Sequence, residues 1–349
     1  MRVNFIIPNI PNAPSGGHKI MYEYANEFAA KGHDVHLYHV ATIDRIKYNM
    51  PHWLRMIRTR LFFPDSKPKW FDFDKRIQTH NIPRISKELI RPADANILTM
   101  WAEVLNFQFI GDTLGKRINL IQGYETWMAS EDDVHQSYQT GTINIAISEY
   151  LADKVEDATG ERPHVIKNFI SSNFQKKKEL ADRSSASVSM LYSTITCKGS
   201  SWGIKALDIV KKQIPQLQVE MFGIFNRPDN LPTWINYTQR PKDLCALYNS
   251  VSIHISPSIN DGWDLPCTEA MKCGCALVCT DIAGHKEYAR DGETALLVQP
   301  QDAEALAESI IKMIQDDELR SRIASNGLQE AEKYTLEIAY QKLITIIQS

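Results

Sequence analysis

Two carboxylates, Asp261 and Glu269, stand eight residues apart in the second half of the chain. The apolar run Ile253–Ser256 before them predicts a strand, and Pro266 and Gly274 predict the start and the end of a helix. One carboxylate then precedes the helix and the other lies on it, so both can face one ligand. Carboxylates suit vicinal hydroxyl groups, and free N–H groups at a helix N-terminus suit phosphate. The pattern predicts a site for a phosphorylated ligand rich in hydroxyl groups.

The residues around this pair resemble family 4 of the retaining glycosyltransferases, whose signature is E-x7-E. Asp261-x7-Glu269 stands in that position, and the sequence also fits the family pattern over 257–258, 262–266, 280–287 and 291–297. The resemblance is specific over 188–315 and looser in the first half of the chain. It implies a GT-B fold and transfer of a sugar from a nucleoside diphosphate with retention of anomeric configuration.

The resemblance also implies roles for single residues. Glu269 would bind the donor ribose, Asp261 would contact the transferred sugar, and Lys198 would neutralise the diphosphate. Backbone amides would hold the diphosphate and sugar hydroxyls, at Gly262, Trp263, Asp264 and Leu265. Outside this motif, Lys198 would be interpreted as a solvated loop lysine and Glu269 as a first-turn glutamate that interacts with the helix dipole.

Three departures from the family pattern concern the donor. Asp261 replaces the usual Glu and reaches one methylene less. Asp264 stands where the family usually has Gly, which is expected to put a carboxylate near the donor and to weaken binding of an anion by repulsion. Ser193 stands where the family often has Arg. Charge compensation then rests on the single lysine, on helix dipoles, or on another residue such as Arg240 or Arg227.

The first half of the chain offers candidates for the other ligand groups. Gly16 and Gly17 lie between the first predicted strand and helix, and the resemblance assigns such a pair to the donor phosphate and the acceptor. Gln122 and Glu125 follow another strand in a Gln-x-x-Glu pattern of some bacterial cell-surface transferases, so we expect them to bind the acceptor. Glu125 is also a candidate catalytic group that orients the acceptor hydroxyl. Trp101 is predicted to form an aromatic wall of this site. The alternatives are an ordinary loop glutamate and a tryptophan buried in the core.

Residues 45–62 combine five basic side chains with several apolar and aromatic ones and contain no acid. This composition is typical of a segment at a membrane surface, and the lipid-linked acceptors of the family favour the same interpretation. The alternative is a plain amphipathic lid helix. Residues 1–100 carry a net charge of +6 against −9 for the remainder, so the first half is expected to meet something anionic. The net negative charge of the whole chain and the lack of a nucleic-acid recognition motif argue against a nucleic-acid partner.

The elements that must position these groups alternate between strand and helix. Apolar runs at Val3–Ile7 and Val35–Val40 flank helical spacing over His18–Lys31, a βαβ unit that implies a parallel sheet. A second alternating series begins at Val188, after a polar stretch. For 349 residues we predict an α/β chain of GT-B type, with two doubly wound Rossmann-like domains facing a central cleft. Dehydrogenases and periplasmic binding proteins share this general plan.

The predicted boundaries follow from these series. Residues 1–168 form the acceptor domain, residues 169–333 form the nucleotide-sugar domain, and a last helix near 334–349 packs back on the first. Further strands are predicted at 95–100, 118–122, 142–148, 165–166, 188–192, 218–222, 253–256, 276–279 and 295–298. Further helices are predicted at 150–158, 203–213, 241–249, 266–272, 303–315 and 317–333.

The composition predicts where the protein works and what it lacks. No apolar run reaches the roughly eighteen residues of a membrane span, and the first apolar run is too short for a signal peptide. We therefore expect a cytoplasmic protein that can touch the inner face of the plasma membrane through residues 45–62. The six cysteines show no Cys-x-x-Cys pair, so they are expected to be reduced and buried. No metal and no cofactor besides the substrate nucleotide sugar is expected.

The predicted function is glycosyl transfer, of the hexosyl- or rhamnosyltransferase class (EC 2.4), to a glycan or lipid-linked acceptor in polysaccharide biosynthesis. Two alternatives remain open. A GT-B nucleotide-sugar epimerase would need further acid–base side chains in the cleft. A non-catalytic GT-B relative would bind a nucleotide or glycan without transfer, and detectable sugar transfer or donor turnover separates it from the enzyme.

Overall fold

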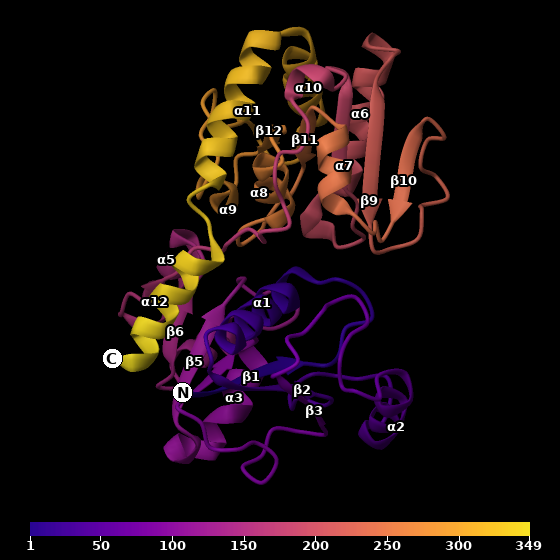
Figure 1. The fold of residues 1–349 in the computed structure, drawn as a ribbon. Helices are drawn as coiled ribbons and strands as arrows, with labels where there is room; N and C mark the ends of the chain where they lie inside the picture. The colour runs from indigo at the N-terminus through magenta and orange to yellow at the C-terminus, as the bar shows by residue number, and fades with distance from the viewer. The chain divides into compact units, whose positions relative to one another are not determined.

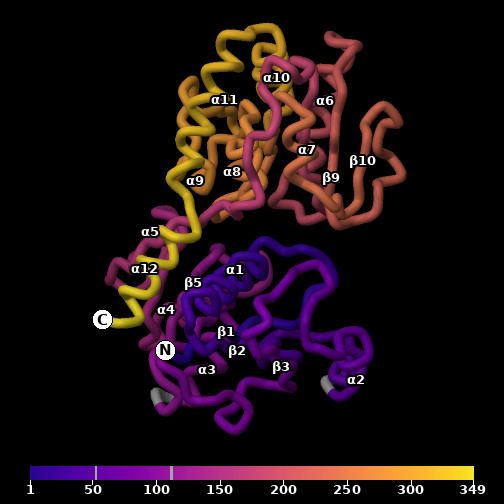
Figure 2. Tube along the Cα trace, in the orientation of Figure 1, coloured from indigo at the N-terminus to yellow at the C-terminus, as the bar shows by residue number. Residues whose placement is uncertain are grey.

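The computed structural model spans residues 1–349 and forms two compact units, each an α/β domain (Figure 1). One unit is Met1–Asn168 with Leu336–Ser349, and the other is Phe169–Thr335. The structure describes residues 1–51, 53–110 and 113–349; His52, Gly111 and Asp112 are grey in Figure 2.

The first unit is built on a seven-stranded parallel sheet in the order β3-β2-β1-β4-β5-β6-β7. Its central strands are buried apolar runs, as expected for a sheet covered on both faces. The strands are β1 (Arg2–Pro8), β2 (Asp34–Val40), β3 (Gln78–Ile82), β4 (Ala95–Leu98), β5 (Lys116–Ile121), β6 (Ile143–Ala146) and β7 (His164–Val165).

Helices connect and cover this sheet. They are α1 (Gly16–Ala30), α2 (His52–Phe62), α3 (Trp101–Phe107), α4 (Glu131–Tyr138), α5 (Glu149–Thr159) and α12 (Leu336–Gln348), with a 3-10 segment, η1, at Gln108–Leu114. Gly32 follows α1 with φ +86°, the left-handed conformation in which a glycine commonly ends a helix. The C-terminal α12 packs on α1: the rings of Tyr340 and Phe28 are 4.9 Å apart, and Lys31 lies 2.7 Å from Glu337.

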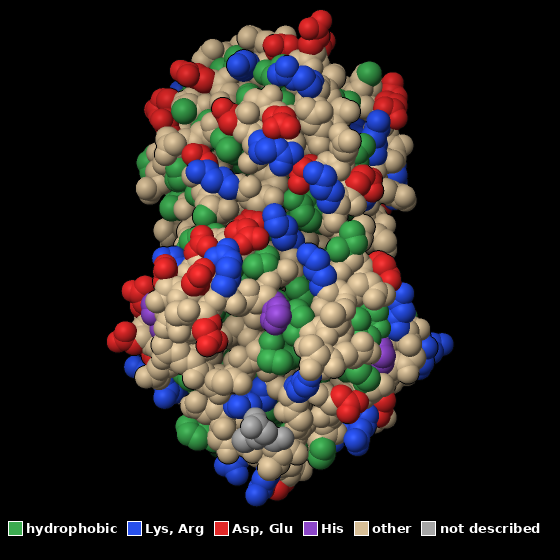
Figure 3. Space-filling model, turned by 90° about the vertical axis from the view of Figure 1, so that its left-hand side faces the viewer, with side chains coloured by type: hydrophobic (Ala, Val, Ile, Leu, Met, Phe, Trp, Pro, Cys, Tyr) green, Lys and Arg blue, Asp and Glu red, His purple; other side chains and the backbone are tan. Residues whose placement is uncertain are grey.

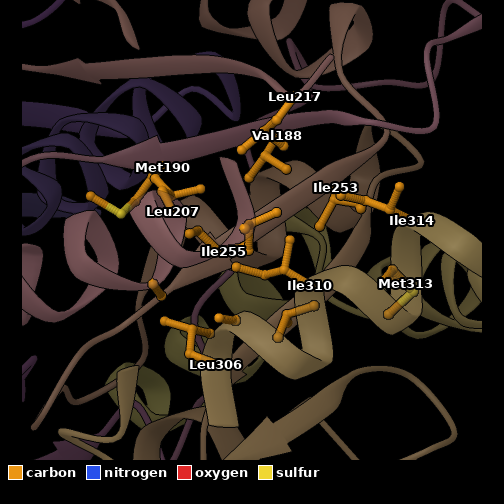
Figure 4. Close-up of a cluster of buried hydrophobic side chains, with 14 of the residues drawn as sticks. Val188, Met190, Leu207, Leu217, Ile253, Ile255, Leu306, Ile310, Met313 and Ile314 are labelled. Carbon is orange, nitrogen blue, oxygen red and sulfur yellow. The ribbon is translucent and has the colours of Figure 1, made fainter. Parts of the chain in front are cut away.

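The second unit holds a six-stranded parallel sheet in the order β10-β9-β8-β11-β12-β13. Apolar side chains from β8 and β11 meet those of α6 and α10 in its core (Figure 4). The strands are β8 (Ser187–Leu191), β9 (Gln218–Gly223), β10 (Ile235–Gln239), β11 (Ile253–Ser256), β12 (Ala276–Thr280) and β13 (Leu296–Val298).

Six helices accompany the second sheet. They are α6 (Ser200–Gln213), α7 (Leu244–Ser250), α8 (Leu265–Lys272), α9 (Ala283–Lys286), α10 (Ala303–Gln315) and α11 (Asp317–Ala331), with 3-10 turns η2 (Leu180–Asp182) and η3 (Thr196–Lys198). The predicted ends of the site helix are confirmed: Pro266 lies in the first turn of α8, and Gly274 follows its end with φ +79°.

Both sheets have the same doubly wound order, in which the first strand of the unit pairs with the second on one side and the fourth on the other. Chain direction across the sheet reverses at this place, between β1 and β4 and between β8 and β11. Open α/β sheets bind ligands at the carboxyl ends of strands beside such a switch point. The predicted site residues can therefore be judged by whether they follow these strands.

The surface is mixed in charge. Acidic and basic side chains are interspersed over much of the face shown in Figure 3. Among the described residues, no helix is long and apolar enough to cross a membrane.

Candidate active site

The second unit brings Lys198 and Asp261 together at its switch point. Lys198 ends η3, which follows β8, and Asp261 lies in the loop after β11. β8 and β11 are neighbours in the sheet, so residues 63 apart in sequence meet. The Lys198 ammonium forms an ion pair with the Asp261 carboxylate, and the two side chains are 24% and 16% exposed. Both predicted residues thus occupy a partly open position where a ligand can reach them.

The charge of Lys198 is maintained in this setting. Burial disfavours the ammonium, but the carboxylates of Asp261 and Asp264 outweigh it and raise the pKa of Lys198. Asp264 Oδ1 lies 4.0 Å from Lys198 Nζ. Lys198 is thus a fixed positive charge at the switch point, as a diphosphate-binding lysine must be.

The Asp261 carboxylate also holds the turn that follows it. Asp261 Oδ1 accepts the backbone N–H groups of Trp263 at 3.2 Å and of Asp264 at 3.1 Å. The prediction of free amides at these two positions is therefore wrong for this structure, because the side chain two or three residues earlier satisfies them. A donor phosphate would have to displace Asp261 from these amides or use Gly262 and Leu265.

Trp263 is a core residue. Its side chain is 2% exposed, its ring lies against Tyr288 and Tyr334, and its Nε1 faces Thr268 Oγ1 at 3.4 Å. As a predicted donor-binding residue it can contribute only through its backbone.

Asp264 is buried and does not project toward the ligand position as an unpaired charge. Its Oδ2 accepts hydrogen bonds from Ser256 Oγ at 2.5 Å and Ser258 Oγ at 3.3 Å, and His285 Nε2 lies 3.1 Å away. Burial opposes ionisation, but Lys198 and His285 outweigh it and lower the pKa of Asp264. The expected repulsion of an anionic donor is thus corrected: this carboxylate is compensated inside the domain. Sequence reasoning did not identify His285.

Glu269 lies on α8, one turn beyond Leu265, and is 5% exposed. Its burial differs from that of an ordinary first-turn glutamate on a solvated helix face. The helix α8 begins directly after the turn held by Asp261, so the positive end of its dipole adjoins Lys198 and Asp261.

Ser193 stands where the family often has Arg, and the two arginines considered as substitutes differ in whether they are free to meet a ligand. The Arg227 guanidinium donates to the carbonyls of Ile235, Leu231 and Pro232 at 2.8–3.2 Å, so it braces the β9–β10 connection. Arg240 is exposed and lies just after β10 with φ +51°. Ser193 receives a hydrogen bond from Ile195 N on its hydroxyl and holds the loop after β8.

The first unit gathers its predicted residues at the corresponding switch point. Gln122 follows β5, and its Nε2 donates to Gly17 O at 3.1 Å and Thr99 Oγ1 at 2.6 Å. Gly16 and Gly17 form the first turn of α1 rather than the preceding loop, and a Cβ on Gly17 would meet Gln122 at 3.5 Å. Gln122 therefore joins the segments that follow β1, β4 and β5.

Glu125 lies beside this junction and accepts the backbone N–H of Trp101 on Oε2 at 2.9 Å. Burial raises its pKa to about 7. A carboxyl with this pKa can hold or release a proton near neutrality, which suits a group that orients an acceptor hydroxyl. The neighbouring Glu103 is fully buried, and burial raises its pKa as well.

The predicted aromatic wall at Trp101 is not formed. Trp101 is 4% exposed because it begins α3 with its ring in the core, so the alternative interpretation holds. The exposed aromatic side chain near Gln122 is instead Trp127, which is 59% exposed and packs on Gly123. The hydrophobic pair Trp127-Met128 in a polar loop was the available sequence signal.

All six cysteines are unpaired, and five are buried, with Cys197 half-buried. In the part of the chain whose side chains are described, one group of side chains has the ligand types of a metal site: Asp264, Cys267 and His285, with ligand atoms within 4.8 Å of one another. It lies inside the domain rather than at the open position beside Lys198.

Comparison with known proteins identifies the fold. Residues 172–330 match the family described as "Glycosyl transferases group 1". The structure resembles sucrose-phosphate synthase from Thermosynechococcus elongatus, with a TM-score of 0.75, 16% identity and coverage of 99% of this chain and 98% of that one. It also resembles Anabaena HepE in complex with UDP and glucose, with a TM-score of 0.76, 13% identity and 99% of both chains covered. The fold is therefore GT-B, the two-domain Rossmann-like fold of glycosyltransferases, which confirms the predicted fold class.

Sequence relatives share a shorter region. The chain is 32% identical over 106 residues to O-antigen chain mannosyltransferase B of Escherichia coli, an alignment that covers 30% of this chain and 27% of the relative. It is 28% identical over 112 residues to an N-acetylgalactosaminyltransferase of Campylobacter jejuni that acts on a diphospho-undecaprenol-linked sugar, with 32% and 30% covered. The matches thus span less than a third of these relatives' lengths.

Proposed function

We propose that this protein is a retaining glycosyltransferase that moves a sugar from a nucleoside diphosphate sugar to a hydroxyl of a glycan or lipid-linked acceptor in polysaccharide biosynthesis. The observation that carries the proposal is the convergence of Lys198, Asp261 and the start of α8 at the switch point, within the segment matched by the glycosyltransferase family. We propose the hexosyl- or rhamnosyltransferase class on the resemblance to family 4.

In the proposed reaction the protein acts mainly by stabilising charge on the leaving group, and less by transferring protons. The bond between the sugar C1 and the diphosphate oxygen breaks, a bond from C1 to the acceptor oxygen forms on the same face, and the acceptor proton passes to the departing diphosphate. Lys198 and the α8 N-terminus would stabilise the charge that develops on the diphosphate. Glu269 would hold the ribose, Asp261 would contact the sugar, and no metal would be required.

The acceptor would bind to the first unit. Gln122 and Glu125 lie together at its switch point, and Glu125 with a pKa of about 7 would orient the acceptor hydroxyl. A glycan or a lipid-linked sugar both present such a hydroxyl.

Donor binding is tested by thermal stabilisation with UDP, GDP, dTDP, ADP and their sugars. We expect one nucleotide to raise the melting temperature of the wild type, by the equivalent of about 2.7 kcal/mol at a hundredfold excess over Kd. Glu269→Ala should lose this shift, whereas Glu318→Ala, which removes an exposed carboxylate of the same unit, should keep it. Stabilisation without sugar transfer or donor turnover would favour the non-catalytic relative, and no stabilisation by any nucleotide would refute the donor site.

A second proposed contact is with the inner face of the plasma membrane, through α2. Its apolar side chains face solvent: Trp53, Ile57, Leu61 and Phe62 are 48–75% exposed. Arg55 turns inward, where its guanidinium donates to Ala41 O at 3.0 Å and stacks 3.7 Å from the centre of the Tyr48 ring. A solvent-facing apolar surface beside arginines is what an interfacial helix needs.

Sedimentation with vesicles containing anionic lipid tests this contact. Leu61→Ser with Phe62→Ser should abolish binding, whereas Ile338→Ser, which removes a hydrophobic side chain that is 48% exposed on α12, should not. Equal sedimentation of the two variants would refute a membrane role for α2.

A further inference from the structure

His285 is fully buried within the short helix α9, and both of its ring nitrogens face oxygen acceptors. Nδ1 lies 2.7 Å from the backbone carbonyl of Thr280, and Nε2 lies 3.1 Å from Asp264 Oδ2. A neutral imidazole has one N–H and cannot donate to both. The Thr280 hydroxyl, 3.3 Å from Nδ1, donates to Ser258 O and is not available to the ring. Either the ring carries two protons, or the Asp264 carboxyl carries one.

The surroundings of Asp264 decide between these states. Oδ2 already receives the hydroxyls of Ser256 and Ser258, and Cys267 Sγ lies 3.6 Å away, an arrangement that stabilises a carboxylate rather than a carboxylic acid. The nearest lysine, Lys198, is paired with Asp261 and stands 4.0 Å from the other Asp264 oxygen. An ionised Asp264 therefore needs a second counter-ion, and His285 is the group in contact with it.

The other titratable groups around the ring are thiols and a phenol. Cys267, Cys279 and Tyr288 contact or adjoin it. Burial opposes protonation of the imidazole, but Cys279 and Asp264 outweigh it and raise the pKa of His285. Of these groups, Asp264 is the carboxylate in direct contact with the ring, 3.1 Å from Nε2.

We propose that His285 is a buried imidazolium whose ion pair with Asp264 positions the donor-binding turn and neutralises the charged cluster of Lys198, Asp261, Asp264 and His285. His285 touches no substrate in this arrangement, so it is a positioning residue. That this turn binds a nucleoside diphosphate rests on the proposed function.

The positioning follows from a chain of contacts. Asp264 adopts a left-handed backbone conformation with φ +64°, and its N–H helps to hold the Asp261 carboxylate that pairs with Lys198. Gly284, the residue before His285, lies so close that a Cβ on it would be 2.3 Å from Asp261 O. Movement of His285 would therefore shift the turn from both of its sides.

The effect on nucleotide binding follows from the charges of four side chains. Lys198 and His285 carry two positive charges and Asp261 and Asp264 two negative ones, so the cluster is neutral. Loss of the imidazolium leaves one excess negative charge beside the place of an anionic diphosphate. At an effective dielectric constant of about 20, one such charge should weaken binding by about tenfold or more.

Nucleotide affinity provides the first test. With UDP, GDP and dTDP as probes, His285→Gln should bind the recognised nucleotide at least about tenfold more weakly than wild type. Adding Asp264→Asn removes the excess charge and lets two amides hydrogen-bond, so the double variant should recover most of the loss. His254→Gln is the matched control: His254 is buried in the same unit, burial lowers its pKa to about 4, and the substitution exchanges one neutral side chain for another. Failure of the double variant to recover affinity would overturn the charge argument.

The protonation state is measured separately, by nitrogen-15 NMR of the histidine rings and by metal analysis of the purified protein. At pH 7.5, above the ordinary pKa of a histidine, we expect two N–H groups on His285 and a neutral ring on His254 in the same spectra. A single N–H on His285 would overturn the proposal, and so would about one bound metal ion per chain held by Asp264, Cys267 and His285. If wild type binds no nucleotide, the proposed function fails, while the spectra still decide the ion pair.

Discussion

Glu125→Gln should stabilise the first unit in a manner that depends on pH. The Glu125 carboxyl is half-buried and accepts the Trp101 N–H, an interaction that a glutamine side-chain oxygen can also make. The substitution therefore keeps the shape and the hydrogen bond and removes only the ability to ionise.

The magnitude follows from the pKa. Burial raises the pKa of Glu125 from 4.5 to about 7. Between these values the folded protein retains a proton that the unfolded chain has released, so the stability contribution is complete below pH 4.5 and is lost as the pH rises through 7. Above pH 7 the difference corresponds to at most about 3 kcal/mol, which glutamine would restore. The charge of Glu125 also raises the pKa of Glu103, so the variant should reduce the pH dependence without removing it.

Melting temperatures at half-unit steps from pH 5 to 8.5 would test this prediction. The advantage of Glu125→Gln should be near zero at pH 5 and grow to several degrees at pH 8. Glu161→Gln, which changes an exposed carboxylate of the same unit, should show no such growth. A difference in melting temperature between Glu125→Gln and wild type that stays constant from pH 5 to 8.5 would refute the inference that burial keeps this carboxyl protonated.

Three further predictions concern the donor loop, the acceptor side and metal dependence. Gly199→Ala should destabilise the second unit by about 2–5 kcal/mol in denaturant titrations, because φ is +62° and a Cβ would lie 2.0 Å from Pro257 O; wild-type stability would contradict the close contact. Trp127→Ala should raise the KM for the acceptor with little change in kcat, since its exposed ring is available for stacking on a sugar; a change in donor KM alone would count against this role. Treatment with EDTA and gel filtration should leave the transfer rate within about twofold, because Lys198 and the α8 dipole would neutralise the leaving group, whereas loss that Mg²⁺ restores would show a metal requirement.

The strands that sequence predicts well are those buried on both faces. β1, β8 and β11 are buried along their length except at their ends, and their predicted positions agree with the structure to within a residue at each end. The strands that sequence missed, β3 and β10, lie at the sheet edges with the sequences QTHNI and INYTQ. An edge strand pairs on one side and faces solvent on the other, so it needs no continuous apolar run.

Among the missed helices, α4 did carry a readable signal. Ser130 caps its N-terminus by accepting the Asp133 N–H at 3.2 Å, and three acidic residues fill the first turn. The segment is short and has few apolar residues, so its helical period was weak. Capping chemistry was the better guide here than hydrophobic periodicity.

In the candidate site, too, sequence could predict the position of some residues and not of others. Lys198 and Asp261 could be placed together because each follows a strand of a predictable parallel sheet. Neither the inward turn of Trp101 nor the His285–Asp264 contact could be predicted, because both depend on how loops and short helices fold back after a strand. Residue spacing fixes which end of a sheet a loop occupies and leaves the direction of its side chains open.

The replacement of Glu by Asp at position 261 has a structural consequence of its own. An aspartate oxygen can reach the backbone N–H groups two and three residues ahead, and Asp261 does so at Trp263 and Asp264 while its other oxygen pairs with Lys198. A glutamate, one methylene longer, is less suited to this local turn. Asp261 therefore occupies the lysine and two backbone amides of the proposed donor site, and a diphosphate that used these groups would have to displace it. The shorter side chain thus stabilises this loop through its own hydrogen bonds, and Asp264 anchors the end of the loop to Ser256, Ser258 and His285.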